Sequence, residues 1–218
     1  MIRYPILLVS ALALSACVNS PPPAGAPAPK ASISQTIPAD KVWLTGSSNI
    51  RAFTCRATLV NLSVEAAPDD FERTKRDGLP AVRSAALQVP VNSLDCGIGL
   101  QNKHLLETLD APNQPTISFS LADYAVDRSE PGSNVRMEGL LRIAGKERSM
   151  IIHGTVSRNA AGQLILRGAR EIDVRSFGIT APRRFFGLLR VRNEVTVHFE
   201  VTVRPLIDPL GVLVSSLQ

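Results

Sequence analysis

The stretch VTVHFEVTV, residues 195–203, alternates apolar and polar side chains without a break. Successive side chains of an extended strand point to opposite faces, so the valines and Phe199 fall on one face and Thr196 and His198 on the other. This period of two predicts a strand with one face against an apolar interior and the other in water.

The same alternation recurs over most of the chain. Strand-like runs cover 41–48, 50–65, 87–91, 117–121, 134–144, 149–158, 163–175 and 188–204. Turn-forming residues separate them, as at Pro131-Gly132-Ser133 and Ala161-Gly162. One segment departs from this rhythm, because residues 99–110 carry leucines at helical spacing and predict a short helix of about three turns. About eight antiparallel strands with one inserted helix predict an all-β fold, either a sandwich or a closed barrel.

The aromatic content argues against a membrane-spanning barrel. Such a barrel has a polar lumen and faces the lipid with aromatic girdles at both interfaces. One Trp and two Tyr cannot form two girdles. A barrel of this chain is therefore expected to have an apolar interior, and with eight strands that interior can hold one small or elongated ligand.

The N-terminus reads as an export signal. Residues 6–16 are mostly apolar but too short to span a bilayer, and the single positive residue Arg3 precedes them. The ending LSAC, which closes at Cys17, looks like a bacterial lipobox, in which that cysteine is acylated and becomes the new N-terminus. An ordinary signal peptide with a chance cysteine is the alternative. Because residue 18 is Val rather than Asp, the inner-membrane retention signal is missing, and we expect a periplasmic protein anchored to the outer membrane.

Composition divides the chain into four parts. Residues 1–16 are the expected signal peptide, and residues 17–38 combine the acylated cysteine with a Pro- and Ala-rich tether that cannot build a core. Residues 39–205 form one domain of ordinary size. The apolar tail 206–218 is too short to span a membrane, and it either packs across a barrel end or is disordered.

The net charge of the chain is mildly basic. The formal charge of +5 becomes +4 once the signal peptide with Arg3 is removed. This excess fits a solvated surface, or contact with anionic lipid head groups at a membrane. Nucleic acid is not an expected partner, because an envelope protein does not meet it.

The cysteine count points to a disulfide. Without the acylated cysteine, Cys55 and Cys96 remain as an even pair in an oxidising compartment. A bond between them would close a loop of about 42 residues and stabilise the fold by about 4 kcal/mol in the chain-entropy model. Two free buried thiols are the alternative. No CxxC motif supports a redox role.

Four segments in a fixed order resemble the YceI-like family of lipocalin-like periplasmic proteins. They are VWLTGSSNIRAFTC (42–55), HLLETLDAPNQPTISFSL (104–121), GLLRIAGKERSMIIHGTV (139–156) and RSFGITAPRRFFGLLRVRNEVTVHFEV (175–201). Two features depart from the family pattern. Ser176 stands where many relatives carry Asp, and Arg183, Arg184 and Phe185 replace a loop that is often Pro-rich and uncharged.

The resemblance implies a lipocalin-like eight-stranded antiparallel barrel whose pocket binds a polyisoprenoid or a similar long amphiphile. Such a ligand needs few polar contacts, because burying apolar area is worth about 25 cal/mol per Å². The candidates for ligand contact on faces expected to point inward are Trp43, Phe53, Leu87, Val89, Ile117, Phe119, Leu121, Met137, Leu141, Val197 and Phe199. Alternatively, these side chains pack against one another and fill the barrel.

The loop near the expected barrel mouth supplies further candidates. Phe177, Ile179 and Phe185 are apolar residues in or beside this loop, and we expect them to form a gate or a membrane-facing lip. The neighbouring Arg183 and Arg184 could hold a phosphate or a lipid head group, although loop arginines are commonly just solvated.

Catalytic and metal-binding motifs are absent from the sequence. It contains no G-x-S-x-G, H-E-x-x-H, P-loop or G-x-G-x-x-G pattern. His104, His153 and His198 lie far apart in the sequence, and Glu171 and Asp173 share a strand face that is expected to be solvated. We therefore expect neither an enzyme nor a metal or cofactor site. An enzyme acting on a lipid inside the barrel would need an inward polar pair.

These observations favour an envelope lipoprotein whose barrel carries a long amphiphilic lipid. The alternative is a filled barrel that acts as a structural or interaction protein of the envelope, for instance in stress tolerance. A homodimer is compatible with such a barrel, but no interface stripe stands out in the sequence.

Overall fold

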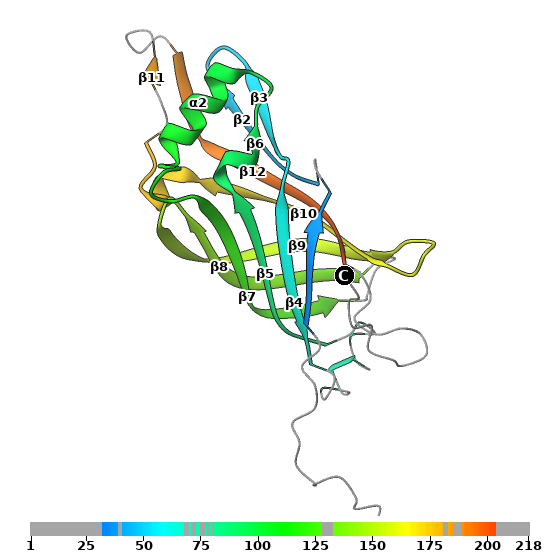
Figure 1. Ribbon diagram of the computed structural model, residues 1–218. Coiled ribbons are helices and arrows are strands. Elements are labelled where there is room, and N and C mark those ends of the chain that lie inside the picture. Colours follow the sequence, from blue (N-terminus) through cyan, green and yellow to red (C-terminus); the bar gives the residue numbers. More distant parts are fainter. Residues whose placement is uncertain are drawn as a thin grey trace, which may run out of the picture.

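The computed structural model describes residues 32–38, 41–67, 70, 73–74, 77, 79, 81–127, 133–180, 183–184 and 189–203. The expected signal peptide, Cys17, Phe185 and the tail 206–218 lie outside the described residues. Within them, antiparallel strands form one sheet that curls into a barrel, with helix α2 lying across one end (Figure 1).

The strands are β1 (Ser32–Ile37), β2 (Val42–Ser48), β3 (Ala52–Ala57), β4 (Val60–Ala66), β5 (Val82–Pro90), β6 (Leu94–Asp95), β7 (Thr116–Asp127), β8 (Ser133–Ile143), β9 (Lys146–Arg158), β10 (Leu164–Asp173), β11 (Arg183–Arg184) and β12 (Leu189–Val203). The helices are α2 (Gly99–Thr108) and two 3-10 turns, η1 (Val91–Ser93) and η2 (Val174–Phe177). None of the helices in the described part of the chain is long and apolar enough to cross a bilayer.

Neighbouring strands follow the order β1-β4-β5-β7-β8-β9-β10-β12-β2-β3-β6, and β11 pairs with β12. Two residues separate β3 from β4, and the two strands run on along the same side of the barrel (Figure 1). β3 pairs with β2, whereas β4 pairs with β1 and β5. The barrel is thus closed through β12, which pairs with β2 and also accepts a hydrogen bond at Thr202 O from Gln35 Nε2 of β1, at 2.7 Å.

The fold class predicted from the sequence is confirmed, with a correction to the strand count. The sheet has twelve strands rather than eight. The number eight returns when β1–β2 and β3–β4 are each counted as one interrupted strand and the two-residue strands β6 and β11 are set aside. The run 50–65 is interrupted because the backbone N–H of Thr58 leaves the ladder and donates to Ser93 O at 2.8 Å.

The tether predicted for residues 17–38 ends earlier than expected. Residues 32–37 form β1, which pairs with β4 over six residue pairs, and Ile37 is only 1% exposed. The proline-rich composition before this segment concealed the strand. The prediction was wrong here because pairing with β4 satisfies the backbone that a tether would leave in water.

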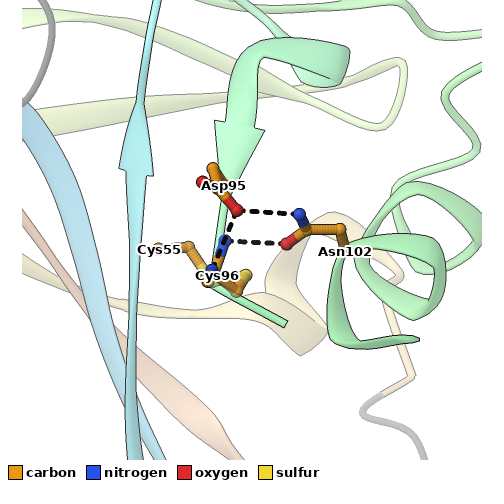
Figure 2. Close-up of a disulfide and its surroundings, with 5 residues drawn as sticks. Cys55, Asp95, Cys96 and Asn102 are labelled. Carbon is orange, nitrogen blue, oxygen red and sulfur yellow. Dashed lines mark hydrogen bonds between the residues drawn. A yellow bond between two sulfur atoms is a disulfide. The ribbon is translucent and has the colours of Figure 1, made fainter. Parts of the chain in front are cut away.

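The predicted helix is confirmed as α2. The Asn102 side chain ties its start to the preceding chain, because Asn102 Oδ1 accepts from the Cys96 N–H at 2.7 Å and Asn102 Nδ2 donates to Asp95 Oδ1 at 2.8 Å (Figure 2). This second hydrogen bond lowers the pKa of Asp95. The end of the barrel where α2 lies is called the helix end below (Figure 1). The opposite end, where β5 begins, is called the far end; Val82 is the first residue of β5 and is hydrogen-bonded to Tyr124.

Candidate ligand-binding site

The barrel encloses a cavity of about 770 Å³. Its walls come from the inward faces of the strands, as the alternating residues of β12 show. This volume lies within the usual range of pockets for small or elongated ligands, which is roughly 300–1,000 Å³. The pairing of β12 with β2 shifts register between Val191 and Val195. After this shift, the inward face of β12 contributes Val195, Val197, Phe199, Val201 and Val203 to the cavity wall.

Three phenylalanine rings in the wall lie directly over glycines of neighbouring strands. A Cβ atom placed on Gly46 would lie 2.4 Å from Phe53 Cζ, and one on Gly168 would lie 2.4 Å from Phe199 Cζ. A Cβ on Gly139 would lie 2.5 Å from the Cζ of Phe119. Each ring therefore occupies space that only glycine leaves free, so the rings lie against the wall instead of filling the lumen.

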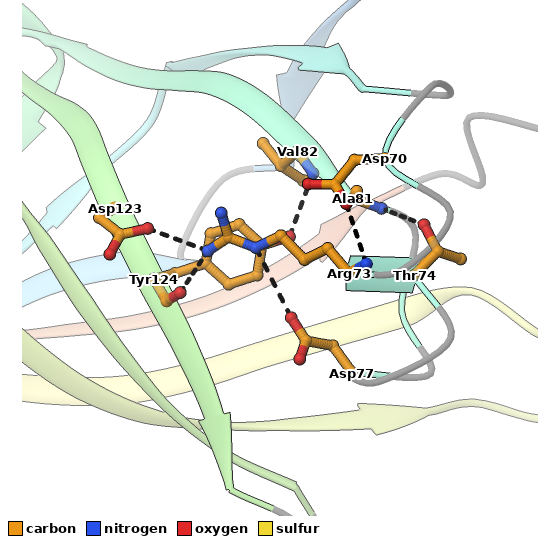
Figure 3. Close-up of polar contacts among 8 residues, drawn as sticks. All are labelled: Asp70, Arg73, Thr74, Asp77, Ala81, Val82, Asp123 and Tyr124. Carbon is orange, nitrogen blue, oxygen red and sulfur yellow. Dashed lines mark hydrogen bonds and ion pairs between the residues drawn. The ribbon is translucent and has the colours of Figure 1, made fainter.

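A charged cluster stands beside the cavity at the far end. The Arg73 guanidinium lies over the Tyr124 ring, 3.9 Å from its centroid, and donates to Asp123 Oδ1 at 2.9 Å and to the Tyr124 carbonyl (Figure 3). Asp77, only 2% exposed, places Oδ2 3.7 Å from Arg73 Nε. The Tyr124 hydroxyl in turn accepts from the Val82 N–H at 3.1 Å. The hydrogen bond from Arg73 lowers the pKa of Asp123. This cation is thus engaged by aromatic, carbonyl and carboxylate partners.

A disulfide stands at the helix end. Cys55 of β3 is bonded to Cys96, which precedes α2, and both residues line the cavity (Figure 2). The predicted pairing is therefore confirmed. The bond fixes the start of α2 to the barrel wall.

The cavity reaches the surface beside α2. Ile50, Ile98 and Leu100 line the cavity and are also 70%, 42% and 64% exposed. Ile50 lies in the turn between β2 and β3, whereas Ile98 and Leu100 lie at the start of α2. These three residues define the mouth. Apolar side chains left in water at an opening are typical of sites that meet an apolar partner.

Three arginines belong to the cavity lining. Arg51 and Arg192 lie close to the mouth, since Arg51 ends the turn that starts at Ser48 and Ser48 pairs with Val191. Arg170 lines the cavity from β10, on the same strand face as Leu166 and Ile172, and its side chain is exposed. The lining residues in the described part of the chain include neither Asp nor Glu.

Sequence reasoning missed Arg170, although a signal was present. Glu171 and Asp173 were assigned to a solvated face, and alternation then requires Arg170 and Ile172 to face the interior.

Polar side chains of α2 also line the cavity at the helix end. They are Gln101, His104 and Thr108.

Most of the predicted contact residues lie in the cavity lining. They are Phe53, Leu87, Val89, Ile117, Phe119, Leu121, Met137, Leu141, Ile179, Val197 and Phe199. Contact with a ligand stays a prediction for each of them.

Trp43 has a different orientation from the one predicted. It borders the cavity, but its indole stacks on the His198 imidazole with ring centroids 5.1 Å apart and planes 5° from parallel. His198 and Thr45, whose Oγ1 lies 3.1 Å from His198 Nε2, belong to the outer face of the sheet. The prediction of an inward ring was wrong, because Val42 takes the inward position opposite Phe199.

The predicted gate at Phe177 was also wrong. Phe177 is 1% exposed, belongs to η2 and packs in the hydrophobic core. β10 pairs with β9 only over Leu164–Gly168. After Gly168, η2 lies next to β9 instead, and Arg148 Nε of β9 donates to Ser176 O of η2 at 3.0 Å. A ring that fills this part of the wall cannot act as a lip. Arg183 and Arg184 form β11, but their side chains are not among the described ones.

The described residues do not bring three or more His, Cys, Asp or Glu side chains together as a set that could hold a metal ion. Two of the histidines, for example, lie at separate places in the barrel. His198 lies on the outer face beside Trp43, and His104 lines the cavity from α2.

Comparison with known proteins identifies the domain. The profile of the YceI-like domain matches residues 41–203. BcnA of Burkholderia cenocepacia has a similar structure, with a TM-score of 0.57 and 20% identity over 75% of this chain and 97% of BcnA. A polyisoprenoid binding domain from Saccharophagus degradans, implicated in plant cell wall breakdown, gives a TM-score of 0.56 and 17% identity over 81% of this chain and all of that domain. At these identities the likeness shows a shared fold. No curated protein matches the chain significantly.

Proposed function

Because the chain belongs to the YceI-like family, we propose that its barrel binds a polyisoprenoid or a similar long amphiphilic lipid. The observation that carries this proposal is the cavity of about 770 Å³ with its almost wholly apolar walls. The solved domain from Saccharophagus degradans, named as polyisoprenoid binding, adds support through its shared fold.

The energetics of such binding need no special motif. Each CH2 group that moves from water into an apolar site gains about 0.8 kcal/mol, so a chain of several isoprene units can bind through burial alone. The three rings held over Gly46, Gly139 and Gly168 favour an open lumen over a filled one. The cavity therefore supports a carrier over the filled-barrel interaction protein. The function proposed is binding, with no chemical step.

The proposed location is the periplasmic face of the outer membrane. It rests on the sequence before Cys17, whose ending LSAC looks like a lipobox and is followed by Val18. An acylated Cys17 would keep the barrel beside a bilayer, where long amphiphiles are found.

Native mass spectrometry of the full chain carrying Cys17→Ser, secreted to the periplasm and purified without harsh detergent, tests the proposal. Organic extraction of the same sample identifies what is bound. We expect a long-chain lipid at near-stoichiometric yield. A clean apo mass from several hosts, together with no uptake of added polyprenol, would refute the carrier function and favour the filled-barrel alternative.

A further inference from the structure

The charged side chains that line the cavity in the described part of the chain are all of one sign. Arg51, Arg170 and Arg192 line it, and the described lining residues contain neither Asp nor Glu. No described residue forms an ion pair with any of the three side chains, unlike Arg73 at the far end. All three side chains are exposed, so their charges stay in contact with water beside the apolar lumen and are accessible to an incoming anion.

Arg170 is the most informative of the three. It lies on β10 opposite Val197 of β12 in the strand register, with Gly168 and Ile172 on the same inward face. Its neighbours in the wall are thus apolar or lack a side chain. The Arg170 side chain is exposed and forms no ion pair with a described residue, so its guanidinium is open to an anion that enters the lumen.

The polar groups of the lining are distributed unevenly along the barrel. Arg51 and Arg192 lie near the mouth, Arg170 lies on the half of β10 nearer to the helix end, and α2 adds Gln101 and His104. Toward the far end, by contrast, the lining consists mainly of aliphatic residues and Tyr124. These aliphatic residues are Val126, Val135, Val156, Leu164, Leu166, Val201 and Val203. This gradient matches a ligand with a charged head and an apolar tail.

We propose that the cavity selects lipids with an anionic head group, a phosphate or a carboxylate, which Arg170 binds together with Arg51 and Arg192. This inference rests on the proposed function and specifies the class of lipid. The tail extends toward the far end, and the head group faces the helix end. A planar guanidinium can donate two parallel hydrogen bonds to such an anion, and these are stronger than hydrogen bonds between neutral groups.

Isothermal titration calorimetry with matched ligands tests this selectivity. The full chain carrying Cys17→Ser is titrated with geranylgeranyl monophosphate and with geranylgeraniol, which share one tail and differ in head-group charge. We expect the phosphate to bind at least about tenfold more tightly than the alcohol, with a preference that falls as salt rises. Palmitate, compared with hexadecanol, separates carboxylate from phosphate recognition.

Substitution of Arg170 assigns the selectivity to this residue. Arg170→Gln should weaken phosphate binding about tenfold and change alcohol binding less than about twofold. Arg170→Lys keeps the charge but loses the bidentate donor, and it should recover part of the preference. Arg142→Gln is the matched control, because Arg142 lies on the outer face of β8 and is exposed. Thermal unfolding of each variant shows whether it is folded.

The outcomes separate this inference from the proposed function. Equal binding of phosphate and alcohol by the unsubstituted chain would overturn the inference and leave lipid binding intact. An equal loss of both ligands in folded Arg170→Gln would also overturn it, because Arg170 would then act on the cavity as a whole. Binding of neither ligand pair by the unsubstituted chain would overturn both proposals.

Discussion

The two ends of the barrel use arginine in opposite ways. At the far end Arg73 is bound within the fold, since it stacks on Tyr124 and contacts Asp123 and Asp77. At the helix end the lining arginines have no acidic partner among the described residues, and the chain is held by the Cys55–Cys96 bond instead. A covalent cross-link thus does near the mouth what an ion cluster does at the far end.

The difference shows how a cation can be kept for a ligand. An arginine that stabilises the fold must be paired, and a paired arginine offers little to an incoming anion. A disulfide stabilises without using any charged group. The mouth can therefore be ordered while its cations stay available.

Removing the disulfide should give the largest effect on stability. The Cys55→Ser, Cys96→Ser double variant releases a loop with a sequence separation of 41 and should lower the free energy of unfolding by about 4 kcal/mol. Urea unfolding at pH 7 measures this loss. Because the start of α2 is then freed, the variant should also bind geranylgeraniol more weakly. Unchanged stability would contradict the role assigned to the cross-link at the helix end.

Removing the far-end cation should cost slightly less. Arg73→Met removes the guanidinium that lies 3.7 Å from Asp77, which is 2% exposed, and we expect the free energy of unfolding in urea to fall by about 3 kcal/mol. Adding Asp77→Leu should recover part of that loss, because the buried carboxylate that Arg73 faced is then removed as well. If the double variant is no more stable than the single one, the two side chains are not coupled. The control is Arg142→Met on the outer face.

A smaller effect is expected at the wall between the two ends. In Gly46→Ala the new methyl group overlaps the Phe53 ring, which must turn toward the lumen. Stability should fall by about 1–2 kcal/mol, and geranylgeraniol should bind more weakly because the lumen is narrower. Adding Phe53→Leu should restore binding. The control Gly99→Ala, whose Cβ would meet nothing within 4 Å, should be as stable as the parent or slightly more so.

The smallest effect concerns a second paired carboxylate on the outer face. Glu200 accepts hydrogen bonds from Lys41 Nζ at 2.5 Å and Arg167 Nε at 2.9 Å, and these bonds, chiefly that from Lys41, lower its pKa to about 2. A carboxylate with a depressed folded-state pKa stabilises the fold above its unfolded value near 4.5, and this contribution is lost as pH falls from there toward 2. The free energy of unfolding of Glu200→Gln, measured with urea, should be lower than that of the parent at pH 7. This difference should shrink toward pH 3. A difference that is constant with pH would exclude this ion cluster as its source.

The period of two located the strands well, because a sheet with one apolar face repeats its pattern strictly. The run 134–144 corresponds to β8, Ser133–Ile143, and the run 188–204 to β12, Leu189–Val203. The helix was equally clear from its leucines. The strand β1 was missed because it follows a proline-rich segment, and its partner β4 lies outside any local window.

The site was harder to predict than the fold. At Trp43 two apolar residues follow one another, so alternation alone could not say which faces inward. Phe177 looked like a loop residue, because Gly178, with φ of +70°, ends a single 3-10 turn. Arg170 was overlooked because a charged residue was not expected among the residues that line an apolar lumen. Local rules fail most informatively at functional positions, and Arg170 is such a position if the selectivity proposed above holds.

The direction of β1 also sets how the domain would stand on a membrane. β1 begins at Ser32, which pairs with Glu65, and Glu65 pairs with Ser84 close to the far end. The chain thus enters the barrel at the end opposite the mouth. The fifteen residue-to-residue steps from Cys17 to Ser32 reach at most about 50 Å. An anchor on Cys17 would leave the mouth opening away from the anchoring leaflet, toward whatever lies across the aqueous gap. To take up a lipid from the anchoring leaflet itself, the whole domain would have to turn over within the length of its tether.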